Sequence, residues 1–98
     1  LGDDGHTASL FPDNKDNMSD DLIIYSYGKG LKRISLSPKI LSSSSKIIFL
    51  VSGRSKNKAL KRLLDEKESI NRTPAKLIKS NSQIQIFCDE EASSELII

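Results

Sequence analysis

Several residue types are scarce in this sequence, and each scarcity excludes something. The 98 residues include no tryptophan, one cysteine and one histidine, and only 5% of them are aromatic. Few large aromatic side chains make a thin core, so we expect one small domain or part of one. A lone cysteine cannot form an internal disulfide and suits a reducing, cytoplasmic location. Without a pair of cysteines or histidines at ligand spacing, no structural metal site is expected.

Long apolar runs and a dominant charge are also missing. No stretch has the length of a membrane span or the pattern of a signal peptide, so we expect no membrane partner. Fifteen basic and thirteen acidic residues give a formal net charge of +2, which is typical of a soluble protein and not of a nucleic-acid binder. The chain begins at Leu1 and not at an initiator methionine, so we expect a piece of a longer protein.

The sequence does contain an alternation of strand-like and helix-like segments. Apolar, β-branched runs predict strands, whereas capping residues before an apolar stripe predict helices. The expected strands are 22–27, 31–36, 47–51 and 83–88, with residues 81 and 82 as the turn before the last, and the expected helices are 38–41, 55–67, 74–78 and one that begins at Asp89. Strands that alternate with helices predict an α/β layer architecture.

Four local expectations can be tested against a structure. Residues 13–21 are polar and predict an exposed loop. Ser37 followed by Pro38 predicts a helix N-cap with proline in the first turn. The run 47–51 is apolar without alternation, which predicts a strand covered on both faces in a parallel sheet. Cys88 ends another apolar run and is expected to be a small buried hydrophobe.

The first dozen residues contain the strongest candidate for chemistry. His6 is the only histidine, and histidine is the side chain whose ordinary pKa lies closest to neutral. Asp3 or Asp4 could accept a ring N–H and so fix its tautomer. Gly5 lets the backbone turn sharply and lets a ligand approach. From the residues alone, a surface histidine without a catalytic role is the more common situation.

A second candidate lies between the apolar run 47–51 and the helix that follows it. Gly53 would admit an anion to the free N–H groups at the helix start, and Lys56 would supply positive charge. The segment lacks the spacing of a Walker A motif. The other basic residues here are expected to form a solvated helix face; they are Arg54, Lys58, Lys61 and Arg62.

Arg33 is the third candidate. It lies on an expected strand, opposite to the apolar side chains of Ile34 and Leu36. A guanidinium there suits bidentate capture of a phosphate. An ion pair with the acidic loop explains the residue equally well.

Several motifs resemble those of one enzyme family. The run DGHTASLFP at residues 4–12 resembles the signature of 6-phosphogluconolactonases, which are related to glucosamine-6-phosphate deaminases. RISL at 33–36, FLVSG at 49–53 followed by Lys56, and TPA at 73–75 match in the same order. The resemblance implies a Rossmann-like, NagB/RpiA-like α/β fold with a mostly parallel sheet. It also implies that residues 1–98 are the C-terminal part of a single lactonase domain whose N-terminal part is missing.

The resemblance implies roles for the candidate residues. His6 would be the general base that activates water, and Asp4 would orient it. Lys56 matches the lysine that binds the substrate phosphate in the family. Arg33 would line the substrate pocket, and Gly5 and Gly53 would let the substrate approach the backbone. No metal or organic cofactor is implied.

The implied reaction is hydrolysis of 6-phosphogluconolactone to 6-phosphogluconate, with a sugar-phosphate lactone as the partner molecule. The related deaminases have an Asn-Glu pair where this chain has Leu10 and Phe11, and phenylalanine cannot move a proton. Two alternatives stay open: a sugar-phosphate isomerase or deaminase, and a non-catalytic sugar-phosphate-binding module. The oligomeric state has no signal in the sequence. We expect the 98-residue chain alone to be inactive or nearly so.

Overall fold

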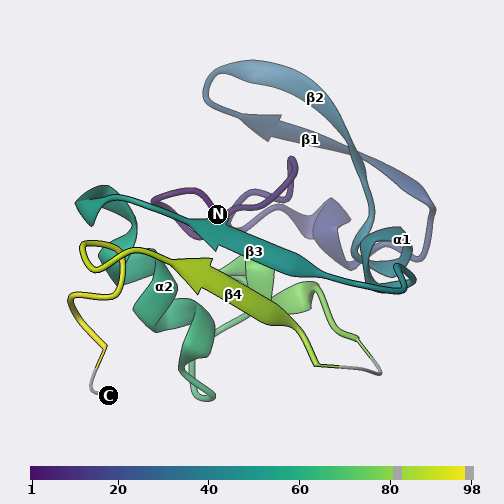
Figure 1. Ribbon diagram of the computed structural model, residues 1–98. Helices are drawn as coiled ribbons and strands as arrows, with labels where there is room; N and C mark the ends of the chain where they lie inside the picture. The colour runs from purple at the N-terminus through teal and green to yellow at the C-terminus, as the bar shows by residue number, and fades with distance from the viewer. Residues whose placement is uncertain (81–82, 97–98) are drawn as a thin grey trace.

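The computed structural model describes residues 1–80 and 83–96, and the expected turn at 81 and 82 lies outside them. These residues form two separate two-stranded sheets together with short helices (Figure 1). In chain order, the elements are η1 (Lys15–Met18), β1 (Ile23–Gly28), β2 (Leu31–Leu36), α1 (Pro38–Ser42), β3 (Ile48–Val51), η2 (Arg54–Lys56), α2 (Asn57–Leu64), η3 (Pro74–Leu77) and β4 (Gln85–Cys88). The segment expected to be a plain loop, 13–21, therefore contains one short 3₁₀ turn.

Strands β1 and β2 form an antiparallel hairpin in which Tyr25 pairs with Ile34 and Gly28 pairs with Leu31. Lys29 and Gly30 make the turn, and both have positive φ, as a tight two-residue hairpin connection requires. One face of the hairpin packs inward through Ile24, which is buried. The opposite face exposes apolar side chains; they are Ile23, Tyr25, Tyr27, Ile34 and Leu36.

Helix α1 begins as the sequence predicts. The Ser37 hydroxyl accepts a hydrogen bond from the Ile40 N–H, and Pro38 occupies the first turn. Ser37 is fully buried, and its hydroxyl satisfies one of the N–H groups that the start of a helix leaves without a partner. The signal is entirely local, which is why the sequence reveals it.

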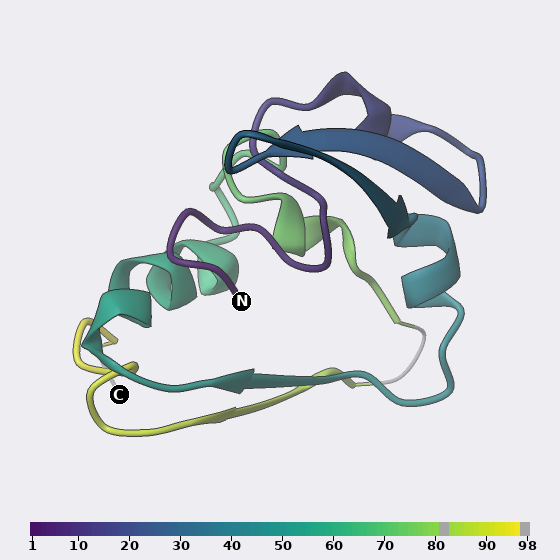
Figure 2. The same ribbon diagram turned by 90° about the horizontal axis from the view of Figure 1, so that it is seen from above.

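Strands β3 and β4 are parallel, with Phe49 opposite Ile86. The loop of residues 1–12 and helix α2 lie on one side of this pair (Figure 2). Phe49 and Val51 point toward them and are buried, whereas Leu50 is 74% exposed. The expectation that 47–51 is covered on both faces is therefore wrong for this chain, because the described residues cover only one face of β3.

The core joins the N-terminal loop to both sheets. Leu10 and Leu60 are fully buried, and Ile24, Val51 and Ala75 pack in the same cluster. Leu10 thus anchors the candidate loop in the interior only four residues after His6. Among the described residues, no helix is long and apolar enough to cross a bilayer.

Three expectations near the C-terminal end need correction. The helix expected over 55–67 starts as η2 and ends at Leu64, because Asp65 turns to extended geometry and its side chain accepts the Lys67 N–H. The helix expected from Asp89 is a series of turns, although the Asp89 carboxylate does accept the Ala92 N–H at 2.8 Å. Cys88 is exposed, since it lies at the end of β4 where that strand is uncovered.

Candidate active site

The loop of residues 1–12 is closed by short backbone hydrogen bonds. The Gly2 N–H donates to the His6 carbonyl at 2.7 Å, and the Gly5 N–H donates to the Gly2 carbonyl at 3.0 Å. Gly5 has a φ of 92°, in the left-handed region that glycine adopts without strain. A Cβ on Gly5 would also lie 3.1 Å from Thr73, so the loop is packed as well as bonded.

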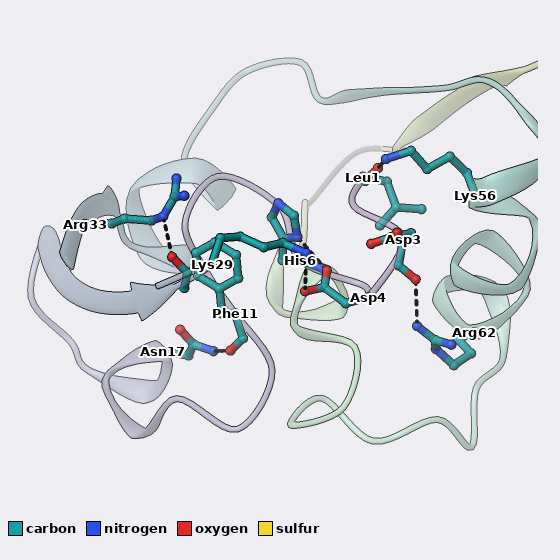
Figure 3. Close-up of polar contacts among 11 residues, drawn as sticks. Leu1, Asp3, Asp4, His6, Phe11, Asn17, Lys29, Arg33, Lys56 and Arg62 are labelled. Atoms are coloured by element: carbon teal, nitrogen blue, oxygen red, sulfur yellow. Dashed lines mark hydrogen bonds and ion pairs between the residues drawn. The ribbon is translucent and has the colours of Figure 1, made fainter. Parts of the chain in front are cut away.

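Asp4 and His6 form a close pair at the centre of this loop (Figure 3). The His6 Nδ1 lies 2.5 Å from Asp4 Oδ1, and the same oxygen accepts the His6 backbone N–H at 3.0 Å. The two side chains are 23% and 32% exposed, so the pair is partly buried and still open to solvent. With Nδ1 facing the carboxylate, Nε2 is the ring nitrogen available to a substrate.

The charge of Asp4 is favoured by its surroundings. Partial burial raises the pKa of Asp4, but the hydrogen bonds from the His6 backbone and ring and the charges of His6 and Lys29 together lower it by more. The pKa of Asp4 therefore lies below its usual value, and the carboxylate stays ionised at neutral pH. Lys29 contributes from the hairpin turn, where its Nζ lies 3.9 Å from Asp4 Oδ2. Nothing in the sequence pattern pointed to Lys29.

Helix α2 and the segment 73–75 donate hydrogen bonds to the loop of residues 1–12. The Ala75 N–H donates to the Gly5 carbonyl at 3.1 Å. Arg62 donates through Nη2 to the Asp3 carbonyl at 3.4 Å and through Nε to the Thr73 hydroxyl at 3.3 Å. The expectation that Arg62 belongs to a solvated face is therefore wrong. Its bond to Asp3 spans 59 residues, and no local pattern could have revealed it.

Lys56 reaches the same loop, but Gly53 does not. The Lys56 Nζ donates to the Leu1 carbonyl at 2.8 Å. Gly53 lies one turn earlier, and its N–H faces the carboxylate of Asp89, with both oxygens at 3.1 Å. Gly53 has a φ of 94°, and a Cβ there would meet nothing within 4 Å, so the backbone is open to solvent. The protein's own acceptors thus occupy two donors of the expected anion site.

Arg33 contacts the loop of residues 1–12 through the Phe11 ring. Its Nε donates to the Gly28 carbonyl at 3.0 Å, and its Cζ lies 5.4 Å from the centroid of the Phe11 ring. Among the described residues, Arg33 bonds this carbonyl and not a carboxylate of the acidic loop. Figure 3 places Arg33 and Lys56 on either side of the Asp4–His6 pair.

The described residues hold no group of three or more metal-ligating acidic, histidine or cysteine side chains. A hollow of about 520 Å³ lies elsewhere, between α2, η3 and β4, and none of the candidate residues lines it. The Asp4–His6 arrangement can transfer a proton, because it is an imidazole oriented by a carboxylate with a cation close by.

Comparison with known sequences identifies the family to which the chain is similar. A sequence model of the family "Glucosamine-6-phosphate isomerases/6-phosphogluconolactonase" matches residues 1–87. The chain is 40% identical over 91 residues to the 6-phosphogluconolactonase of Borreliella burgdorferi, covering 89% of this chain and 39% of that protein. It is 32% identical over 97 residues to that of Synechocystis, covering 98% and 40%.

Comparison with solved structures gives the same fold. The crystal structure of a devB protein matches with a TM-score of 0.81 and 28% identity, covering 99% of this chain and 42% of that one. The 6-phosphogluconolactonase of Leishmania guyanensis matches with a TM-score of 0.83 at 21% identity, covering 100% and 40%. The expected α/β fold is thereby confirmed, although the described residues hold one parallel pair and one antiparallel hairpin.

These matches also show how much of its relatives' length the chain covers. The chain spans about 40% of the length of the curated relatives it matches. Its assignment to the C-terminal part of the family's domain stays a prediction, as do the roles of the individual site residues. The family itself is established by the match over residues 1–87: the chain belongs to the glucosamine-6-phosphate isomerase and 6-phosphogluconolactonase family.

Proposed function

We propose that the complete protein hydrolyses 6-phosphogluconolactone to 6-phosphogluconate and that this segment supplies the general base. The observation that carries the proposal is the 2.5 Å contact between His6 Nδ1 and Asp4 Oδ1. Such a carboxylate–imidazole pair orients a base in many hydrolases. The curated relatives are named 6-phosphogluconolactonases, which supports this substrate over other esters.

The proposed reaction balances with His6 and water alone. The water oxygen forms a bond to the lactone carbonyl carbon while Nε2 takes the water proton, and the carbonyl oxygen becomes the oxyanion. The oxyanion then reforms the carbonyl, the ring C–O bond breaks, and Nε2 returns the proton to the departing oxygen. Asp4 stabilises the imidazolium that exists between these two transfers, since its carboxylate stays ionised.

The phosphate would be held by the cations beside the pair. Lys56 now donates to the Leu1 carbonyl, and a phosphate oxygen is a stronger acceptor for an ammonium than a carbonyl is. Arg33 has a single bond from Nε, which leaves its terminal nitrogens for an anion. Gly5 and Gly53 would let the substrate approach the backbone. Holding the phosphate would place the lactone carbonyl near Nε2.

Phe11 favours the hydrolase over the isomerase or deaminase. Its ring lies stacked on His6, in the part of the chain where the related deaminases have a glutamate. An aromatic ring cannot relay the proton that sugar-ring opening requires. A cytoplasmic location and the absence of membrane and nucleic-acid partners remain expectations.

Two assays on the full-length protein test the proposal. The first adds the lactone and follows acid release above the spontaneous background, and the second adds glucosamine 6-phosphate and follows ammonia. We expect acid release that depends on His6, and no ammonia. Ammonia release would support the deaminase instead, and no turnover in either assay would support the binding module.

A further inference from the structure

Phe11 contacts both His6 and the β1–β2 hairpin. Its side chain is 6% exposed, and its ring stacks on the imidazole with centroids 4.6 Å apart and planes 29° apart. The Phe11 carbonyl accepts the Asn17 side-chain N–H at 2.7 Å, which fixes the backbone. Phe11 is therefore buried, while the histidine that it touches is half-buried.

The β1–β2 hairpin fixes the Phe11 ring from outside the loop. Arg33 lies over it at 5.4 Å, and the Arg33 Nε is tied to the Gly28 carbonyl at 3.0 Å. Gly28 presses on the ring so closely that a Cβ there would lie 2.3 Å from it. Three residues from two strands and the loop thus form one contact group around an aromatic ring.

The hydrogen bond to Asp4 does not by itself fix the imidazole. One contact between Nδ1 and a carboxylate oxygen leaves the ring free to rotate about that line, and Nε2 would sweep over an arc. Stacking on an aromatic face removes that rotation, because tilting the ring would break the face contact. The same face attracts the imidazolium that forms when the base takes its proton.

We propose that Phe11 is the positioning residue for His6, and that Gly28 and Arg33 of the hairpin hold the Phe11 ring in place. The inference rests on the proposed function, in which His6 is the base. It adds that the hairpin, which lies outside the catalytic loop, determines the direction of Nε2. Phe11 itself touches the base and not the substrate.

The direct test observes the His6 ring in the full-length protein by NMR, with its signals identified by their loss in His6→Asn. We expect Phe11→Leu to move the His6 ring-proton signals downfield, because the shielding by the stacked ring is lost. Phe49→Leu is the matched control, since Phe49 is a buried phenylalanine on β3. It should leave those signals in place. Unchanged His6 signals in Phe11→Leu would overturn the proposal.

The kinetic test separates positioning from general loss of packing. Phe11→Leu should lower kcat by about 10- to 100-fold, the usual cost of a misplaced group, with KM changed by less than about twofold. Gly28→Ala should do the same without truncating Phe11, because its new Cβ displaces the ring. Gly30→Ala is the control for hairpin strain: its φ of 78° makes a Cβ unfavourable, but that Cβ meets nothing within 4 Å and does not touch Phe11, so kcat should fall by less than in Gly28→Ala.

Two kinetic outcomes would overturn the positioning role. One is a kcat within about threefold of wild type in both Phe11→Leu and Gly28→Ala, which is under 1 kcal/mol of barrier. The other is an equal loss in Phe49→Leu, which would show a packing effect only. A wild-type protein that does not hydrolyse the lactone would refute the proposed function alone, and the NMR shift would still decide whether Phe11 stacks on the His6 ring.

Discussion

The His6 loop and the Gly53–Lys56 turn differ in how complete they are. In the loop, Asp4 and His6 already contact each other, and backbone bonds from Gly2 and Gly5 hold them. In the turn, the Gly53 N–H is bonded to Asp89. Lys56 is bonded to a backbone carbonyl. The Asp4–His6 pair is thus already formed, whereas an anion at the turn would have to displace groups of the protein.

The difference follows from sequence distance. The Asp4–His6 pair joins residues two apart, so a single tight turn creates it. The turn depends on contacts over 36 residues to Asp89 and 55 residues to Leu1. Residues that are close in sequence can be held together at little cost in chain entropy. Bringing distant residues together costs more, because a longer segment of chain must be closed. Under the proposed roles, in which the loop supplies the base and the turn binds the phosphate, substitutions should affect kcat at the loop and KM at the turn.

His6→Asn should produce the largest effect. It keeps much of the shape of the ring but removes the basic nitrogen, so kcat should fall by about 10² to 10⁴ in the full-length protein. The measurement is initial rate of acid release, corrected for spontaneous hydrolysis. A loss of threefold or less would remove His6 from the reaction.

Asp4→Asn should lower kcat by less than His6→Asn does, because the base remains and only its orientation and imidazolium stabilisation suffer. Asp3→Asn is the matched control, since Asp3 is exposed and its interaction with Arg62 uses the backbone carbonyl. Equal losses in the two variants would show that Asp4 has no special role.

Lys56→Ala tests the turn. We expect KM to rise by more than kcat falls, since a phosphate contact is the same in the ground and transition states. Lys61→Ala, on the exposed side of α2, should leave both constants near wild type. An unchanged KM in Lys56→Ala would exclude Lys56 from the phosphate site, and a fall in kcat alone would show that it only braces the loop.

Asp89→Asn should change KM in the opposite direction to Lys56→Ala. The amide still accepts a hydrogen bond but no longer repels an anion at Gly53, so KM for the lactone should fall by up to about fivefold, the effect of one exposed charge. His6 does not contact Asp89, so kcat should not change. A rise in KM would indicate that Asp89 supports the turn and does not compete with the substrate.

The smallest expected effect is on stability in acid. Because the pKa of Asp4 is depressed in the folded state, its contribution to the free energy of unfolding is fully present above the ordinary aspartate value of about 3.9. That contribution is lost as the pH falls through the lower, folded value. Urea unfolding should show wild type ahead of Asp4→Asn by less than about 1 kcal/mol near neutral pH, with the gap closing in acid. A gap that widens in acid would contradict the depressed pKa.

Sequence reasoning succeeded where the signal is local. The Ser37 cap and strand β2 lie within a few residues of the features that specify them. It failed where tertiary context decides: Arg62 bonds a carbonyl 59 residues away, and Asp89 turns to Gly53 and does not start a helix. The stacking of Phe11 on His6 was equally hidden, since the five-residue separation gives no indication that the rings face each other.

Because Gly2 has no side chain, it fits where any other residue would clash, and this limits which residues the loop tolerates at position 2. A Cβ at that position would lie 2.1 Å from His6 Nδ1, closer than atoms can approach. One methyl group would therefore expel the imidazole from its place beside Asp4, although it removes no reactive atom. In a saturation library, residue 2 should tolerate substitution as poorly as residue 6 does. The intolerance at residue 2 would come from lack of space and not from a chemical role of its own.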